Sequence, residues 1–128
     1  MDMKTKFAYT GIRVNDLEKS LDFYTKILGM KVISRTKIEQ AKGEVVNLAT
    51  EEDGQVLELN YYAQDSKFNT EYQVGEGIDH LAFQVDDLEK ATSEADKAGF
   101  PVILSMKTAS SRWAYIKDPN GIYIELFA

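Results

Sequence analysis

The chain has 128 residues, of which 44% are hydrophobic and 28% charged, and this predicts one folded globular domain rather than a disordered segment. A net charge of −6 without a cluster of Lys and Arg argues against a nucleic-acid partner, and the lack of a long apolar run or signal peptide argues against a membrane location and for a cytoplasmic one. Cysteine is absent, so any metal must be held by nitrogen and oxygen ligands.

The first half of the chain predicts a strand, a helix and three further strands. Apolar residues from Phe7 to Val14 favour the first strand. Asn15 is expected to begin the helix, with Glu18 as its partner in a capping box, and Gly29 to end it. The later strands are expected at residues 30–38, 45–50 and 55–62, separated by turns at 40–44 and 51–54.

The second half of the chain repeats the first. Residues 14–19 recur as residues 85–90 with one difference, and the segment from Gly54 to Leu59 recurs from Gly121 to Leu126. Between the copies, residues 63–77 are polar and show no steady period, so they are expected to form a linker or a mobile loop. The repeat predicts an α+β fold of two βαβββ modules, the first at about 7–62 and the second at about 78–128.

His80 is the one histidine of the chain and lies in a predicted strand that starts at Ile78. Alternate residues of a strand share a face, so His80 is expected to lie beside Ile78 and Ala82 and to point into the fold. A core histidine that is hydrogen-bonded to a neighbour is the alternative to a metal ligand. Imidazole is a common ligand of divalent transition metals, which makes His80 a candidate for that role.

Two glutamates, Glu58 and Glu125, lie inside otherwise apolar strands. A lone carboxylate on a dry strand face is costly unless it is paired or bound to a metal. The two occupy equivalent positions in the repeat, and we therefore expect Glu58, His80 and Glu125 to converge on one metal ion. Ion pairs with Arg13 and Arg112 are the alternative.

Tyr9 is the counterpart of His80 in the first copy, 71 positions earlier. If the modules pair about a pseudo-twofold axis, Tyr9, Glu58, His80 and Glu125 form a ring of four. Three roles of Tyr9 remain open: a weak phenol ligand, an acid or hydrogen-bond donor beside an open coordination position, and an aromatic filler of a site that lacks one ligand.

These motifs resemble the vicinal oxygen chelate superfamily, and most closely its lactoylglutathione lyase (glyoxalase I)-like proteins. The resemblance implies the glyoxalase/bleomycin resistance/dihydroxybiphenyl dioxygenase-like fold, a single domain over residues 1–128 and a homodimer. The superfamily hosts isomerases, epimerases, dioxygenases, thiol transferases and drug-binding proteins, so it implies the fold more sharply than the reaction. The stretches that carry the resemblance are residues 11–24, 28–30, 79–83, 118–121 and 124–126.

The resemblance also implies a set of site residues. Glu58, His80 and Glu125 match three of the family's four metal-ligand positions, and Tyr9 stands where the family has histidine or glutamine. Such a set suits a divalent ion such as zinc, nickel, cobalt or manganese. The metal of the family stabilises an enediolate, which forms when the glutamate equivalent to Glu125 takes a proton from the carbon next to a carbonyl.

The implied function is a metal-dependent lyase or isomerase that acts on a small α-oxo carbonyl compound or its thiol adduct. Arg13 matches a position that contacts the glutathione carboxylate, and Tyr62 stands where bacterial lyases tend to have an asparagine for the same ligand. A metal-free, drug-sequestering protein of the same fold is the alternative that Tyr9 favours, and an epimerase is a second. An iron dioxygenase is disfavoured because it needs two histidines.

Overall fold

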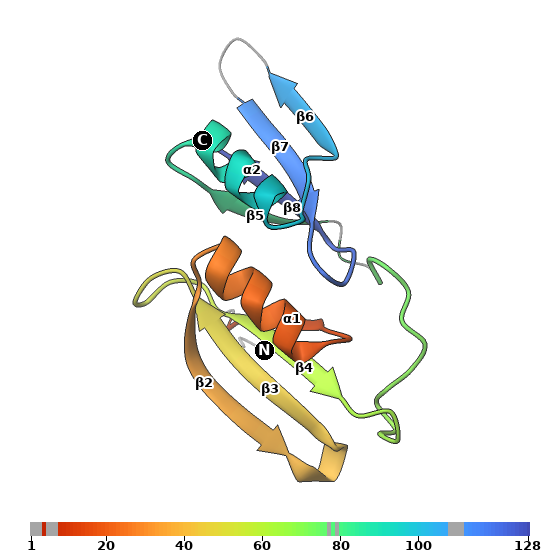
Figure 1. Cartoon of the computed structure of the whole chain (residues 1–128). Helices are drawn as coiled ribbons and strands as arrows, with labels where there is room; N and C mark the ends of the chain where they lie inside the picture. The colour runs from red at the N-terminus through yellow and green to blue at the C-terminus, as the bar shows by residue number, and fades with distance from the viewer. Residues whose placement is uncertain (1–3, 5–7, 77, 79, 108–111) are drawn as a thin grey trace.

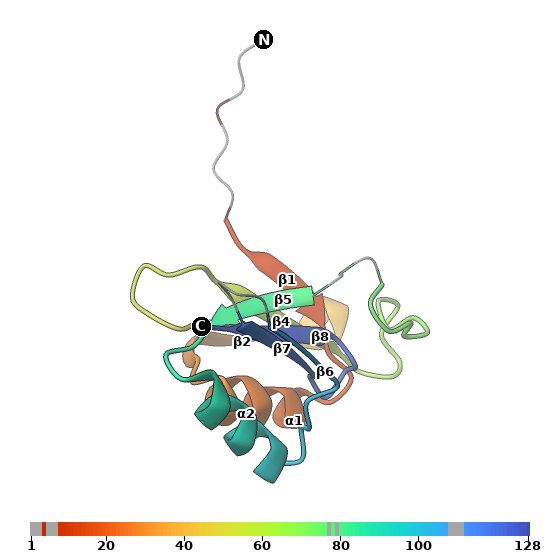
Figure 2. The same cartoon turned by 90° about the horizontal axis from the view of Figure 1, so that it is seen from above.

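The computed structural model describes residues 4, 8–76, 78, 80–107 and 112–128 and contains two four-stranded mixed sheets, each with one helix (Figure 1). The strand orders are β1-β4-β3-β2 and β5-β8-β7-β6. The first and last strands of each module pair in parallel, and the other neighbours are antiparallel. Both helices lie on the same side of the two sheets (Figure 2). The predicted architecture of two βαβββ modules is confirmed.

The bounds of the elements follow the repeat. Module one contains β1 (Thr10–Arg13), α1 (Leu17–Asp22), the π-helical turn η1 (Phe23–Ile27), β2 (Lys31–Ile38), the 3₁₀ turn η2 (Glu39–Ala41), β3 (Gly43–Ala49) and β4 (Leu57–Tyr62). Module two contains β5 (His80–Gln84), α2 (Leu88–Lys97), β6 (Leu104–Lys107), β7 (Arg112–Lys117) and β8 (Tyr123–Phe127). The predicted start at Phe7 lies outside the described residues. Within the part of the chain that is described, no helix is both long and apolar enough to cross a membrane.

The two helices begin at equivalent positions, and the N-cap of α1 is one residue later than predicted. Asp16 caps α1 by accepting a hydrogen bond from the Lys19 amide at 3.1 Å, and the equivalent Asp87 caps α2 in the same way. The predicted capping box of Asn15 and Glu18 is therefore wrong. The amide of Asn15, which Glu18 would have bound in a capping box, donates to Asn120 at 2.9 Å instead.

The core lies between each sheet and its helix. Leu59 and Leu126 are almost fully buried, and each neighbours a glutamate whose side chain is directed to the other face of its strand. The prediction that His80 points into the fold is wrong: its side chain is 35% exposed. The neighbours Leu81 and Phe83 pack against the core instead, because their partners on β8 are the buried residues of that strand.

A buried polar network joins α1 to the turn between β7 and β8. The hydroxyl of Tyr24 donates to Asp118 Oδ2 at 2.9 Å, and the side-chain amide of Asn120 donates to the same oxygen and to Ser20 Oγ. Burial, together with the nearby Asp118 carboxylate, raises the pKa of the Tyr24 phenol, so this side chain keeps its proton. The network fixes module one against module two within the chain.

Replacing Tyr24 by phenylalanine is expected to lower the free energy of unfolding by about 1–3 kcal/mol, because the buried Oδ2 of Asp118 loses one of its two donors. Urea unfolding followed by circular dichroism measures this change. Tyr123→Phe is the matched control, since Tyr123 is 45% exposed and its change should stay within about 0.5 kcal/mol. Equal changes for the two variants would show that the network does not stabilise the fold.

Candidate functional site

Three polar side chains of module two form a cluster on the sheet face that is turned away from the core. His80 Nε2 lies 3.9 Å from Glu125 Oε2, and the hydroxyl of Tyr115 donates to Glu125 Oε1 at 3.4 Å. The rings of His80 and Tyr115 meet edge to face, with 5.7 Å between their centroids. Because Glu125 lies on the strand between β5 and β7, both neighbours reach its carboxylate. We call His80, Tyr115 and Glu125 the module-two cluster.

Module one carries an equivalent set of residues. Glu58 on β4 lies between Gly11 on β1 and Asn47 on β3. The ring of Tyr9 approaches Gly11, since its Cε2 lies 4.0 Å from where a Cβ of that glycine would stand. Asn47 donates to Ser34 Oγ at 3.1 Å, while its Oδ1 is buried and has no hydrogen-bond partner among the described residues. We call Tyr9, Asn47 and Glu58 the module-one cluster.

The two clusters occupy matching places in their sheets. Glu125 pairs with Ala82 and Tyr115 in the register in which Glu58 pairs with Gly11 and Asn47. A glycine or an alanine thus stands beside each glutamate on the neighbouring parallel strand. The strand repeat therefore places equivalent chemistry on both modules.

The described residues of one chain do not bring the two clusters together. Among these residues there is no group of three or more His, Cys, Asp or Glu side chains that could hold a metal. The structure brings His80 to Glu125 but leaves Glu58 and Tyr9 on the other module. Arg13 and Arg112, which were the alternative partners of the glutamates, pair with Glu76 and Glu89 instead.

Sequence reasoning did not identify Tyr115 as a site residue. A signal was present, because the turn at residues 118–121 joins two antiparallel strands and sets residue 115 opposite residue 125. Tyr115 is therefore the hydrogen-bond partner of Glu125 rather than a core aromatic. Phe83 and Tyr61, which are also strand aromatics, do pack against the core.

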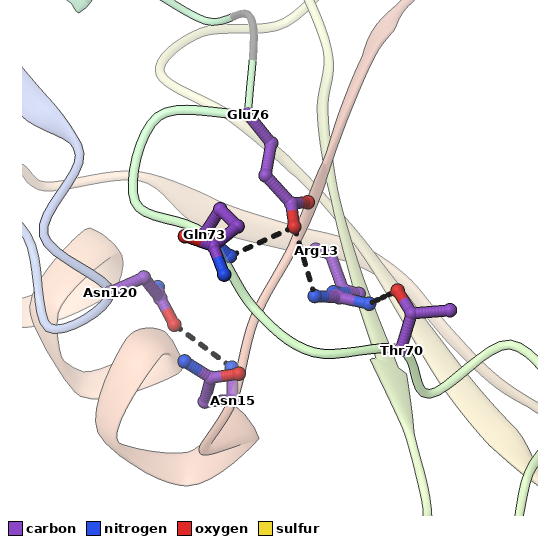
Figure 3. Close-up of polar contacts among 6 residues, drawn as sticks. All are labelled: Arg13, Asn15, Thr70, Gln73, Glu76 and Asn120. Carbon is purple, nitrogen blue, oxygen red and sulfur yellow. Dashed lines mark hydrogen bonds and ion pairs between the residues drawn. The ribbon is translucent and has the colours of Figure 1, made fainter.

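The predicted substrate-binding residues Arg13 and Tyr62 line a common cavity of about 600 Å³, together with Asn69 of the linker. Arg13 is held by the linker: its Nη1 donates to Thr70 Oγ1 at 2.6 Å, and its Nη2 donates to Glu76 Oε1 at 3.3 Å (Figure 3). The lining of the cavity thus includes a cationic group and an aromatic side chain.

The sequence matches the profile of the Glyoxalase/Bleomycin resistance protein/Dioxygenase superfamily over residues 6–126. This chain belongs to that superfamily. Similar members include the lactoylglutathione lyases of Neisseria meningitidis serogroup A and Escherichia coli O157:H7, which are 34% and 32% identical over 126 residues. These matches cover 94% of this chain and 88% and 90% of the relatives.

Solved structures of the superfamily show the same architecture. The trypanothione-dependent glyoxalase I of Leishmania major has a TM-score of 0.80 and 32% identity, and the match covers 96% of this chain and 86% of that one. Glyoxalase I of Zea mays has a TM-score of 0.80 at 24% identity, and the match covers 93% of this chain and 43% of the maize chain. The likeness to the maize enzyme shows the fold alone.

The two clusters of this glyoxalase-superfamily chain fit a divalent metal in their donor types. His80 and Glu125 bring a nitrogen and an oxygen 3.9 Å apart, and two donors on one ion stand at most about 4.2 Å apart, since each ligand bond is roughly 2.0–2.2 Å. The buried Oδ1 of Asn47 beside Glu58, which lacks a partner in the described part of the chain, fits a hydrogen-bond donor carried by a bound group. One cluster alone, however, falls short of the three protein ligands that an open catalytic site uses.

A cavity of about 840 Å³ lies between the two modules of this superfamily member, beside the buried contacts that join them, with walls from β1 and the end of η1 on one side and from β5 and α2 on the other. No strand pairing joins the two sheets in the described part of the chain. The edges of β1 and β5 therefore keep backbone groups that do not pair with the other module.

Proposed function

We propose that this chain is a glyoxalase-like, metal-dependent lyase or isomerase that acts on a small α-oxo carbonyl compound or its thiol adduct. The observation that carries the proposal is the approach of His80 Nε2 to Glu125 Oε2 at 3.9 Å, on a strand face outside the core. The names of the similar lactoylglutathione lyases support the reaction class.

The proposed metal ligands are Glu58, His80 and Glu125, and a homodimer brings them together. In this dimer the module-one cluster of one subunit faces the module-two cluster of its partner. The separation of the clusters within one chain supports this arrangement, as do the cavity between the modules and the equivalent register of both glutamates. A closed twofold pairing builds two identical sites from two incomplete ones.

A bound zinc, nickel, cobalt or manganese ion would supply positive charge beside the carbonyl oxygen of the substrate. Glu125 is the proposed base: it takes the proton from the carbon next to the carbonyl and returns it to the former carbonyl carbon, while the hydroxyl proton of the substrate passes to the former carbonyl oxygen, so the substrate is isomerised without net loss of atoms. Tyr115 positions this carboxylate by donating to its Oε1. Tyr9, which is 51% exposed, is the proposed hydrogen-bond donor to the substrate.

Arg13 and Tyr62 are the proposed contacts for the part of the substrate remote from the reacting carbons. They line one cavity and belong to β1 and β4, and β4 also carries Glu58 of the module-one cluster. A second candidate function is metal-free binding of a small molecule, which Tyr9 favours because it stands in place of a stronger ligand. An epimerase would use the same base and the same metal ligands.

The proposal is tested with the hemithioacetal of methylglyoxal and glutathione as substrate. We expect the purified protein to form the thioester product and to lose at least about 100-fold in rate after the metal is removed with a chelator. Activity should return on addition of nickel or zinc. A protein that forms no product with any of the four ions, but binds the substrate in calorimetry, would support the metal-free binding function instead.

A further inference from the structure

The side chain of Arg13 is held by the linker and not by a neighbouring strand. Besides its bonds to Thr70 and Glu76, its Cζ lies 5.2 Å from the centre of the Tyr72 ring. The Arg13 side chain is 17% exposed, whereas that of Glu76 is 41% exposed. A guanidinium buried to this degree needs a negative partner, and Glu76 supplies it.

The turn that carries Glu76 is organised around this carboxylate. The same Oε1 that binds Arg13 also accepts a hydrogen bond from the Gln73 amide at 2.9 Å (Figure 3), and the Glu76 amide donates to the Gln73 carbonyl at 3.1 Å. Residues 70–76 contain neither helix nor strand. The carboxylate can therefore separate from Arg13 without breaking a sheet or a helix.

Arg13 stands between two cavities. The smaller one, of about 150 Å³, is lined by Arg13 together with Tyr72 and Glu76, and the larger one of about 600 Å³ is lined by Arg13 together with Tyr62 and Asn69. A guanidinium binds a carboxylate best through two N–H groups at once. Nη1 and Nη2 each donate to the linker, and Glu76 offsets the positive charge of the guanidinium, so a ligand carboxylate in the larger cavity competes with Glu76 for the same cation.

We propose that Glu76 is an internal competitor for ligand carboxylates at Arg13 and thereby lowers the affinity of this cavity for carboxylate-bearing thiol conjugates. The inference rests on the proposed function in one respect only, the use of Arg13 as a substrate anchor. Half-exposed ion pairs are modest in strength, so loss of the competitor should tighten carboxylate binding by about fivefold.

Calorimetric titration of the metal-free 128-residue protein tests this effect, with glutathione as the probe and its diethyl ester, in which both carboxylates are blocked, as the match without a carboxylate. Glu76→Gln should bind glutathione about fivefold more tightly than the wild type and should bind the ester with unchanged affinity. Glu71→Gln is the control, since Glu71 lies on the same linker and makes no ion pair with Arg13 among the described residues. Adding Arg13→Gln to Glu76→Gln should erase the gain.

Four results would overturn the inference: equal glutathione affinity in the wild type and Glu76→Gln, an equal gain for the ester, a gain that persists after Arg13→Gln, or no glutathione binding by either protein. Thermal unfolding of each variant verifies that it is folded. Isomerase activity is measured separately. A protein without isomerase activity can still bind glutathione more tightly after Glu76→Gln, which would reject the proposed function alone. An active isomerase whose glutathione affinity does not change after Glu76→Gln would reject this inference alone.

Discussion

Replacing His80 by alanine is expected to weaken the binding of zinc or nickel by at least about 100-fold, because it removes the one imidazole that the proposed site contains. Glu125 would keep its Tyr115 contact, yet the module-two cluster would hold a single strong donor. Calorimetric titration of metal-free protein measures the affinity directly. Tyr9→His should have the opposite effect, since it adds an imidazole to the module-one cluster.

Gln84→Ala is the matched control for His80→Ala, since Gln84 is also exposed and lies at the other end of β5. Its metal affinity should equal that of the wild type. If the wild type binds no divalent ion and His80→Ala behaves identically, the metalloenzyme account is wrong and metal-free binding of a small molecule replaces it.

Glu125→Gln is expected to lower kcat by about 100- to 10,000-fold at saturating metal, because the amide cannot accept the substrate proton. The substitution preserves the shape of the side chain, so the fold should persist. Steady-state kinetics over a range of metal concentrations separates this loss from weaker metal binding. Glu89→Gln is the control, since the side chain of Glu89 is 80% exposed and pairs with Arg112 on the surface.

A rate for Glu125→Gln that returns to the wild-type value when metal is added in excess would contradict the role of Glu125 as base. Glu125 would then be a ligand only, and another group would have to move the proton. The same experiment on Glu58→Gln should show the ligand pattern, with activity recovered in part at high metal concentration, because Glu58 is assigned no proton transfer.

The internal repeat made the fold predictable from the sequence. The repeat of residues 14–19 at 85–90 predicted two equivalent helices, and α1 and α2 do begin at the equivalent residues Leu17 and Leu88. The capping box failed because it considers only contacts within one helix. The side chain of Asn120, more than 100 residues away, accepts a hydrogen bond from the amide of Asn15, and Asp16 caps the helix instead.

The direction of His80 was predicted wrongly because alternation gives two faces but not which of them is buried. The apolar residues Ile78 and Ala82 suggested that the face of β5 that carries His80 is buried. The pairing with β8 shows that the opposite face is buried, since Leu81 and Phe83 lie opposite Ile124 and Leu126. A parallel partner 43 positions along the chain is not visible in a local pattern. The approach of His80 to Glu125 survived this error because both residues lie on the same outer face.

The ion pair of Arg13 with Glu76 was beyond the sequence pattern. The linker shows no periodicity, so nothing in it marked Thr70, Tyr72 or Glu76 as partners of a strand residue. The separation of the two clusters within one chain could not be predicted either, because the repeat shows that their positions are equivalent but does not indicate the distance between them.

Mixing Glu58→Gln with Glu125→Gln tests most directly whether each site is built from two subunits. Each variant alone should be nearly inactive at limiting metal. After joint unfolding and refolding, half of the dimers combine both variants, and each mixed dimer contains one site with both glutamates intact. The account predicts recovery of about a quarter of the wild-type activity in an equimolar mixture. A mixture that stays as inactive as its separate components would contradict a site shared between subunits.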